Sequence, residues 1–242
     1  MARRTLPEFA FLWQQHELLY LTIFSTALNT LADESHLSGD EDAVSEKLCP
    51  ILRSICFNIA HSQNREIRTP LWEPPIPPVS EEELKGGKIR KRPDFTCNCY
   101  NSFAKYAEEY EIPLHIECKF LGQPTSPSWI LNKNYVSNGI KRFDSLEHEY
   151  GKRASSGLMV GYIIDMTPET ILDEVNNYQA EECSQNRAIT FAFTKEHVNT
   201  THQILSRTTV KPENFKLTHM WADLRHNYQR QKKSTKPKKR KT

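Results

Sequence analysis

The chain has 242 residues, of which 38% are apolar and 26% are charged. These values are typical of one globular domain with a sizeable core, and they exclude an intrinsically disordered protein. The chain holds only 8 glycines, and neither a GxGxxG nor a GxxxxGK[ST] pattern occurs, so a glycine-rich phosphate-binding loop is excluded. No apolar run reaches the ~18 residues that a membrane span requires.

The formal net charge of +2 is unevenly distributed. Residues 230–242 hold eight Lys and Arg and no acid, which leaves a net charge of −6 on residues 1–229. This tail is predicted to be disordered when free and to hold nucleic acid without sequence preference; a nuclear-import signal is the alternative interpretation. The six cysteines form no CxxC pair and no secretory framework, which predicts reduced thiols and a cytoplasmic location.

The N-terminal part of the chain predicts two helices. Apolar residues recur with helical spacing over 9–31, and Phe11 and Leu18 spread apolarity around the helix. This pattern predicts cover on more than one side, either by the rest of the chain or by a second subunit. A second helix is predicted over 42–60, where Pro50 favours a kink or two shorter helices.

A proline-rich segment separates these helices from the sheet. A short strand is predicted near 65–68, and residues 70–83, rich in Pro and Glu, are predicted to form neither a helix nor a central strand. A loop of this length is uncommon in a compact domain, which indicates a functional or mobile segment.

The remaining segments alternate between strand and helix patterns, which predicts an α/β fold with a mixed sheet flanked by helices. The predicted strands are 92–100, 114–121, 156–165 and 188–194, and the predicted helices are 102–111, 135–150 and 168–179. In domain terms, we predict an N-terminal helical segment at 1–37, one domain at 38–229 and the basic tail at 230–242.

Polar side chains share one face of the predicted strand 114–121. The period of two places His115, Glu117 and Lys119 together, and Asp94 comes close to Glu117 if this strand pairs with the preceding one. Two neighbouring carboxylates repel each other unless a cation lies between them, and Mg²⁺ prefers such oxygen ligands. A nearby Lys can orient or deprotonate a water, so these groups together suffice for hydrolysis of a phosphodiester.

Pro93-Asp94, followed after 22 residues by Glu117-Cys118-Lys119, resembles the motif of the PD-(D/E)xK nuclease superfamily, which includes restriction endonucleases, junction resolvases and phage-defence effectors. The resemblance covers about residues 40–194 and implies a restriction-endonuclease-like αβββαβ core. It implies that Asp94 and Glu117 bind Mg²⁺, or Mn²⁺ in its place, and that Lys119 serves the nucleophile. On the preceding helix we assign Glu46 as an additional metal ligand, with Glu41, Asp42 and Glu66 as competitors.

The implied function is cleavage of nucleic acid, DNA before RNA, in restriction or antiviral defence. A structure-selective repair nuclease or junction resolvase is one alternative, and a module of the same fold that binds nucleic acid or a partner without cutting is another. Whether the chain binds a second copy of itself or a partner subunit of a defence system is left open. No membrane association is expected.

Basic residues lead into the predicted site. They are expected to contact the phosphate backbone, with a solvated charged loop as the alternative. The residues are Lys85, Lys88, Arg90, Lys91 and Arg92, together with Lys141 and Arg142 on the predicted helix 135–150.

Three cysteines, Cys97, Cys99 and Cys118, are predicted to lie on the opposite face of the two strands. Zinc binding would need a fourth ligand and usually uses cysteine pairs in loops. We therefore predict that these thiols pack in the core.

Overall fold

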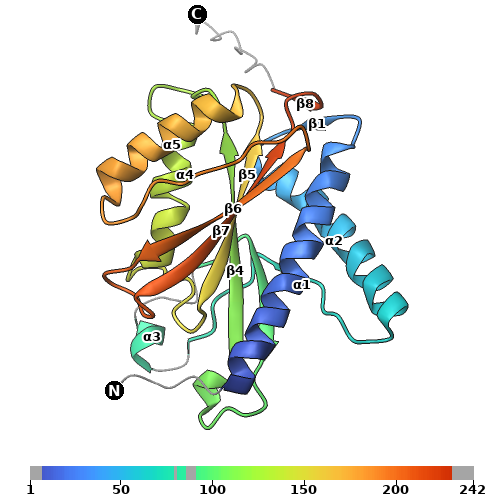
Figure 1. Cartoon of the computed structure of the whole chain (residues 1–242), viewed down its shortest axis with the longest axis vertical. Coiled ribbons are helices and arrows are strands. Elements are labelled where there is room, and N and C mark those ends of the chain that lie inside the picture. Colours follow the sequence, from blue (N-terminus) through green and yellow to red (C-terminus); the bar gives the residue numbers. More distant parts are fainter. Residues whose placement is uncertain (1–6, 79–80, 86–90, 231–242) are drawn as a thin grey trace, which may run out of the picture.

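Figure 1 shows the computed structural model of the chain, which describes residues 7–78, 81–85 and 91–230. Its centre is a six-stranded sheet, with strands β2 and β3 at one end and β6 at the other. The strands follow the order β2 (Leu71–Trp72), β3 (Phe95–Tyr100), β4 (Glu111–Leu121), β5 (Ser156–Ile163), β7 (Asn214–Asp223) and β6 (Val198–Ser206). The pairs β2–β3, β3–β4 and β7–β6 are antiparallel, whereas β4–β5 and β5–β7 are parallel. The predicted α/β class with a mixed sheet is confirmed.

Helices cover both faces of the sheet (Figure 1). Helices α1 (Pro7–Ala32) and α2 (Glu41–Gln63) share one hydrophobic core with β3 and β4. Helices α4 (Leu131–Ser137) and α5 (Pro168–Glu182) share a second core with β5 and β7. The sheet is therefore a layer between two apolar cores, and even polar side chains on its central strands are buried.

Helix α1 buries only one of its sides. Its large residues Trp13, Phe24 and Leu28 are buried, whereas Phe11 and Leu18 stay 59% and 65% exposed. The prediction that the rest of the chain covers Phe11 and Leu18 is therefore wrong, since no described part of the chain buries them.

Helix α2 begins at a well-formed cap, where the Asp40 side chain accepts a hydrogen bond from the Ala43 N–H at 3.0 Å. It then continues through Pro50 as one helix, so the prediction of two shorter helices is wrong. Pro50 lies on the exposed side of α2, while Val44, Leu48 and Leu52 pack in the core. Packing along the whole apolar side stabilises the helix despite the proline.

Several connections differ from the sequence-based prediction. Residues 65–68 form no strand, and the edge strand of the sheet is β2, which comes later in the chain. The proline-rich segment contains a five-residue helix, α3 (Glu81–Lys85), where none was predicted. The predicted helix 102–111 is mostly turns with a 3-10 turn at Ala107–Glu109. These short elements lack the apolar periodicity by which a sequence reveals a helix or strand.

The C-terminal part of the sheet was also predicted incompletely. The predicted helix 135–150 is replaced by α4, which begins earlier and ends at Ser137, and by a 3-10 turn, Ile140–Asp144. Residues 188–194 form no strand, whereas β6 and β7, which follow them, were not predicted. The strand at 156–165 and the helix at 168–179 are confirmed as β5 and α5.

The two ends of the described chain are attached to the rest of the fold. Strands β1 (Leu37–Ser38) and β8 (Tyr228–Gln229) pair in parallel, so the end of the predicted N-terminal segment lies beside the end of the predicted domain. Arg230 forms an ion pair with Asp165 at 2.9 Å, so the structured part extends one residue into the predicted tail. The tail itself, 231–242, lies outside the described residues. None of the helices described here is long and apolar enough to cross a membrane.

Arg207, which follows β6, holds the segment that follows the 3-10 turn Ile140–Asp144. Its guanidinium is buried, and it donates hydrogen bonds to the backbone carbonyls of Phe143, Tyr150, Gly151 and Pro212. Burial lowers the pKa of Arg207 to about 10, so the group remains charged at neutral pH.

Replacing Arg207 by Met is expected to destabilise the protein by about 3 kcal/mol or more, because several buried carbonyls would lose their donor and each costs about 1–3 kcal/mol. Urea unfolding measures this change in the free energy of unfolding. Arg53→Met, at an exposed position on α2, is the control and is expected to stay within about 0.5 kcal/mol of the wild type. Equal stabilities of the two variants would contradict the assigned role of Arg207.

Candidate active site

The site lies where β4 extends beyond its neighbour β3. Pairing between these strands ends at Phe95 and Ile116, but β4 continues to Leu121. Backbone N–H groups on this open edge need other acceptors. The Asp94 carboxylate accepts a hydrogen bond from the Cys118 N–H at 2.5 Å, and the Glu41 carboxylate accepts one from the Phe120 N–H at 2.8 Å. The open edge of β4 thus brings two acids from different elements beside Glu117 and Lys119.

Lys119 is the centre of this group. Its Nζ lies 2.8 Å from Glu41 Oε1, 3.4 Å from Glu117 Oε2 and 3.6 Å from Asp94 Oδ2. Arg142, in the 3-10 turn Ile140–Asp144, donates a hydrogen bond of 2.7 Å to the same oxygen, Glu117 Oε2. We call these five residues, Glu41, Asp94, Glu117, Lys119 and Arg142, the acid–lysine cluster.

Glu117 is the most deeply buried acid of the cluster. Its side chain is 0% exposed, compared with 17% for Asp94 and 28% for Glu41. Burial and, after it, the charge of Asp94 together raise the pKa of Glu117 to about 8, although Lys119 and Arg142 act in the opposite direction. Within the described residues its Oε1 has no hydrogen-bond partner. A buried carboxylate in this state is costly, which is typical of a functional site.

Lys119 remains protonated in this environment. Burial alone would lower its pKa, but the charges of Asp94, Glu41 and Glu117 outweigh that effect and raise the pKa above its usual value. Of the two roles that the sequence suggested, orienting a water is therefore compatible with this ammonium, whereas removing a proton from the water is not.

The cluster has the donor chemistry of a Mg²⁺ site without being a preformed cage. Across residues 7–78, 81–85 and 91–230, no three His, Cys, Asp or Glu side chains are arranged as ready metal ligands. Each carboxylate of the cluster is instead turned toward Lys119 or Arg142. The partnerless Oε1 of Glu117, with Asp94 nearby, nevertheless supplies the hard oxygen donors that Mg²⁺ prefers, so these residues fit such an ion.

Glu46, assigned from the sequence as a metal ligand, is not brought to the cluster. It is exposed on α2, on the side opposite the buried Val44 and Leu48. The acid that joins Lys119 is Glu41, the first residue of the helix, because the N-terminus of α2 points at the open edge of β4. The structure therefore replaces Glu46 by one of the competitors that the sequence left open.

We expect Glu41→Gln to lower any metal-dependent activity about tenfold or more, and Glu46→Gln to leave it unchanged. Glu41 contacts Lys119 directly, and groups that support a metal site usually contribute about 10- to 100-fold. The two variants form a matched pair, since both remove one charge from the same helix. Comparison of their cleavage rates over a range of Mg²⁺ concentrations measures the difference, and a larger loss in Glu46→Gln would reverse the assignment.

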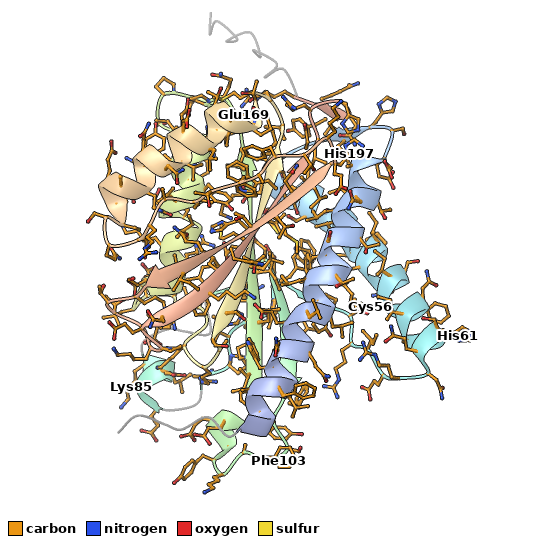
Figure 2. All side chains as sticks on the ribbon, viewed as in Figure 1. Cys56, His61, Lys85, Phe103, Glu169 and His197 are labelled. Atoms are coloured by element: carbon orange, nitrogen blue, oxygen red, sulfur yellow. The ribbon has the colours of Figure 1, made fainter. Side chains whose placement is uncertain are left out.

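The predicted phosphate-contacting residues lie in different surroundings. Lys85 ends α3 at the periphery of the molecule (Figure 2), and Arg92 is also exposed. Lys91 pairs with Glu147, and Lys141 pairs with Glu182 at 3.3 Å. Lys88 and Arg90 lie outside the described residues. Arg142 points inward to Glu117 instead of standing on a free surface, and no sequence pattern indicated this role.

The cysteines and His115 are structural neighbours of the site. Cys97, Cys99 and Cys118 are buried in the core beneath α1 and α2, on the face that the strand alternation predicted. His115 shares a face with Glu117, but its ring hydrogen-bonds to Thr96, and burial lowers its pKa to about 3. It therefore stays neutral and does not join the acid–lysine cluster.

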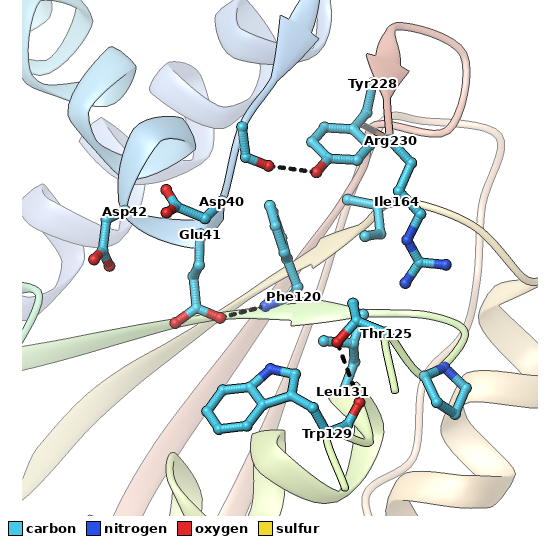
Figure 3. Close-up of a pocket in the computed structure, with 12 residues that line it drawn as sticks. Asp40, Glu41, Asp42, Phe120, Thr125, Trp129, Leu131, Ile164, Tyr228 and Arg230 are labelled. Atoms are coloured by element: carbon cyan, nitrogen blue, oxygen red, sulfur yellow. Dashed lines mark hydrogen bonds between the residues drawn. The ribbon is translucent and has the colours of Figure 1, made fainter. Parts of the chain in front are cut away.

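A cavity of about 610 Å³ opens beside Glu41 (Figure 3). It is lined by acids at the start of α2, by aromatic residues and by Arg230, among them Asp40, Asp42, Phe120, Trp129 and Tyr228. The cluster therefore has an open space next to it.

No family model, curated protein or solved structure matches this chain.

Proposed function

We propose that this protein is a metal-dependent nuclease that hydrolyses phosphodiester bonds, with DNA as the favoured substrate. The observation that carries the proposal is that Asp94 and Glu117 both lie beside the ammonium group of Lys119 at the open edge of β4. Structural ion pairs also perturb pKa values, so the proposal rests on this geometry, to which the partnerless Oε1 of Glu117 adds an oxygen that can serve as a ligand.

The order of elements supports the same proposal. Helix α2 is followed by β2, β3 and β4, then by α4 and β5, and these four strands are neighbours in the sheet. The first three are antiparallel and the last two are parallel. Apart from the five-residue α3 between β2 and β3, this order is compatible with the αβββαβ core that resemblance to the PD-(D/E)xK superfamily implies, and β7 and β6 lie beyond β5.

Each residue of the cluster has a chemical role in this proposal. Asp94 and Glu117 would hold Mg²⁺ or Mn²⁺, with Glu41 beside them. The chemistry supplied by the bound ion is charge stabilisation at the phosphoryl group and a water of lowered pKa. Lys119 donates hydrogen bonds that orient the attacking water and stabilise negative charge in the transition state. Arg142 fixes the Glu117 side chain through its 2.7 Å hydrogen bond.

A non-cutting module of the same fold is the second candidate. Lys119 and Arg142 already compensate the acids, as in a purely structural ion-pair cluster. Restriction or antiviral defence remains the setting that the resemblance favours, and repair or junction resolution would use the same site.

Cleavage assays with purified full-length protein separate these candidates. Supercoiled plasmid, linear duplex and single-stranded DNA are incubated with Mg²⁺, Mn²⁺ or EDTA. The proposal predicts products with either metal and none with EDTA. Binding of DNA without products under all conditions would support the non-cutting module instead.

A further inference from the structure

The cavity beside Glu41 has the size and the walls of a ligand site. Its volume of about 610 Å³ lies within the ~300–1,000 Å³ that is typical of pockets for small organic groups. Figure 3 shows Trp129 at one end of it, with Tyr228 and Arg230 across from Trp129. Phe120 lies between them and contacts the Tyr228 ring, with ring centroids 5.3 Å apart. Aromatic walls of this kind suit a flat ring better than an ion.

Trp129 is an exposed aromatic residue in a loop that is held by backbone hydrogen bonds. Its side chain is 54% exposed, although burying a ring of this size would be favourable. Its backbone N–H donates to the Ser126 carbonyl at 3.0 Å, and its carbonyl accepts from the Thr125 N–H at 3.0 Å. The start of the same loop is attached through Gly122, whose N–H donates to Asn132 Oδ1 at 2.9 Å. The backbone that carries the indole is thus held in place, while the indole itself stays uncovered at the cavity.

The opposite side of the cavity is also preorganised. Arg230 is fixed by its ion pair with Asp165 and by a hydrogen bond of 2.6 Å to the Gln123 carbonyl. The Tyr228 hydroxyl donates to the Gly39 carbonyl at 2.6 Å. Little ordering would be needed when a ligand enters, which favours binding.

We propose that this cavity binds an unstacked nucleobase of single-stranded DNA, with the base stacked on Trp129. The inference rests on the proposed function, because Glu41 belongs both to the cavity and to the acid–lysine cluster. A base held here would lie next to the site of cleavage, so the favoured substrate is a single strand or an unpaired end.

The charges of the lining residues indicate which part of a nucleotide this cavity binds. Asp40, Glu41 and Asp42 lie along one wall and repel a phosphate, whereas Arg230, the one basic residue among the described residues of the lining, is already paired. Asp40 already caps α2, and both oxygens of Glu41 are bonded within the fold, so Asp42 is the acid of this wall that we expect to accept a hydrogen bond from an amino group of a base. The cavity therefore matches a base and not the phosphate that precedes or follows it.

The test measures binding of a short single-stranded DNA oligonucleotide to the full-length protein with EDTA present, so that cleavage plays no part. Base stacking on an aromatic side chain is worth enough that Trp129→Ala should weaken binding about tenfold or more. Trp129→Phe keeps a stacking surface and should retain most of the affinity. Phe103→Ala is the matched control, because Phe103 is also 54% exposed but lies at the opposite end of the molecule (Figure 2).

Equal affinity of the wild type and Trp129→Ala would overturn the inference, as would equal binding of an otherwise identical oligonucleotide that lacks its bases. Failure of the proposed function is a different result, namely no DNA cleavage with Mg²⁺ or Mn²⁺. Because affinity is measured without metal, loss of binding in Trp129→Ala would support the base site even in that case.

Discussion

Replacing Glu117 by Gln is expected to abolish cleavage and to make the metal-free protein more stable. Cleavage falls because a metal ligand is lost, and the several kcal/mol that such an ion supplies correspond to about 10²–10⁴-fold in rate. Stability rises because burial and the charge of Asp94 penalise the ionised Glu117 side chain. Gln keeps the shape and can place its oxygen toward Lys119 and Arg142.

The stability effect has a defined pH dependence. The pKa of Glu117 is raised from 4.5 to about 8, so the folded state binds its proton more tightly than the unfolded state. Its contribution to stability is present below pH 4.5 and is lost as the pH rises through about 8. Because lost pairing with two cations offsets part of the gain, we expect Glu117→Gln to add about 1–2 kcal/mol above the pKa of Glu117.

Urea unfolding at several pH values measures this gain, and cleavage rates measure the accompanying loss. Glu46→Gln, which removes an exposed charge, is the control and should change neither quantity. A purely structural role for Glu117 predicts the opposite sign, namely a loss of stability in Glu117→Gln at all pH values.

Replacing Lys119 by Met is expected to abolish cleavage and to destabilise the metal-free protein. Three carboxylates face this ammonium, and its side chain is only 8% exposed. Removing one partner of a buried ion pair costs about 3–5 kcal/mol, because the remaining charges lose their compensation. Added Mg²⁺ should restore part of this stability, since the cation would offset the same carboxylates.

Thermal unfolding with and without Mg²⁺ tests this expectation. Lys141→Met is the matched control: Lys141 is half-exposed and pairs with Glu182 near the surface, so its loss should cost less than about 1 kcal/mol. If Lys119→Met were as stable and as active as the control, Lys119 could not be the centre of the site.

The sequence predicted the parts of the site that lie on regular strands. The alternation of β4 placed Glu117 and Lys119 on one face, and pairing with β3 brought Asp94 close to them. The long periodic helices and the apolar strand β5 were predicted for the same reason, since a repeating pattern marks a buried side. The burial of the polar face of β4 was not predicted, because the 3-10 turn that brings Arg142 to Glu117 has no sequence signature.

The rest depended on tertiary contacts. Glu41 and Glu46 lie on the same helix, and only the direction in which α2 points at β4 decides which acid reaches Lys119. Arg142 comes from a short 3-10 turn that carries no periodic pattern. Strand β6 alternates between buried and exposed residues in its second half, but the buried residues there include the polar Gln203 and the exposed ones the apolar Ile204, so the sequence carries no matching signal.

Thermal unfolding with added Mg²⁺ measures whether the acid–lysine cluster binds the ion, and it needs no knowledge of the substrate. We expect Mg²⁺ to stabilise the wild type, by about 2.7 kcal/mol at a hundredfold excess over the dissociation constant. The effect should be larger above the pKa of Glu117, about 8, than below it, because the ion must displace the proton of that carboxylate. Glu117→Gln should show no such stabilisation. Equal stabilisation of the wild type and Glu117→Gln, or none in either, would contradict a metal site in the acid–lysine cluster.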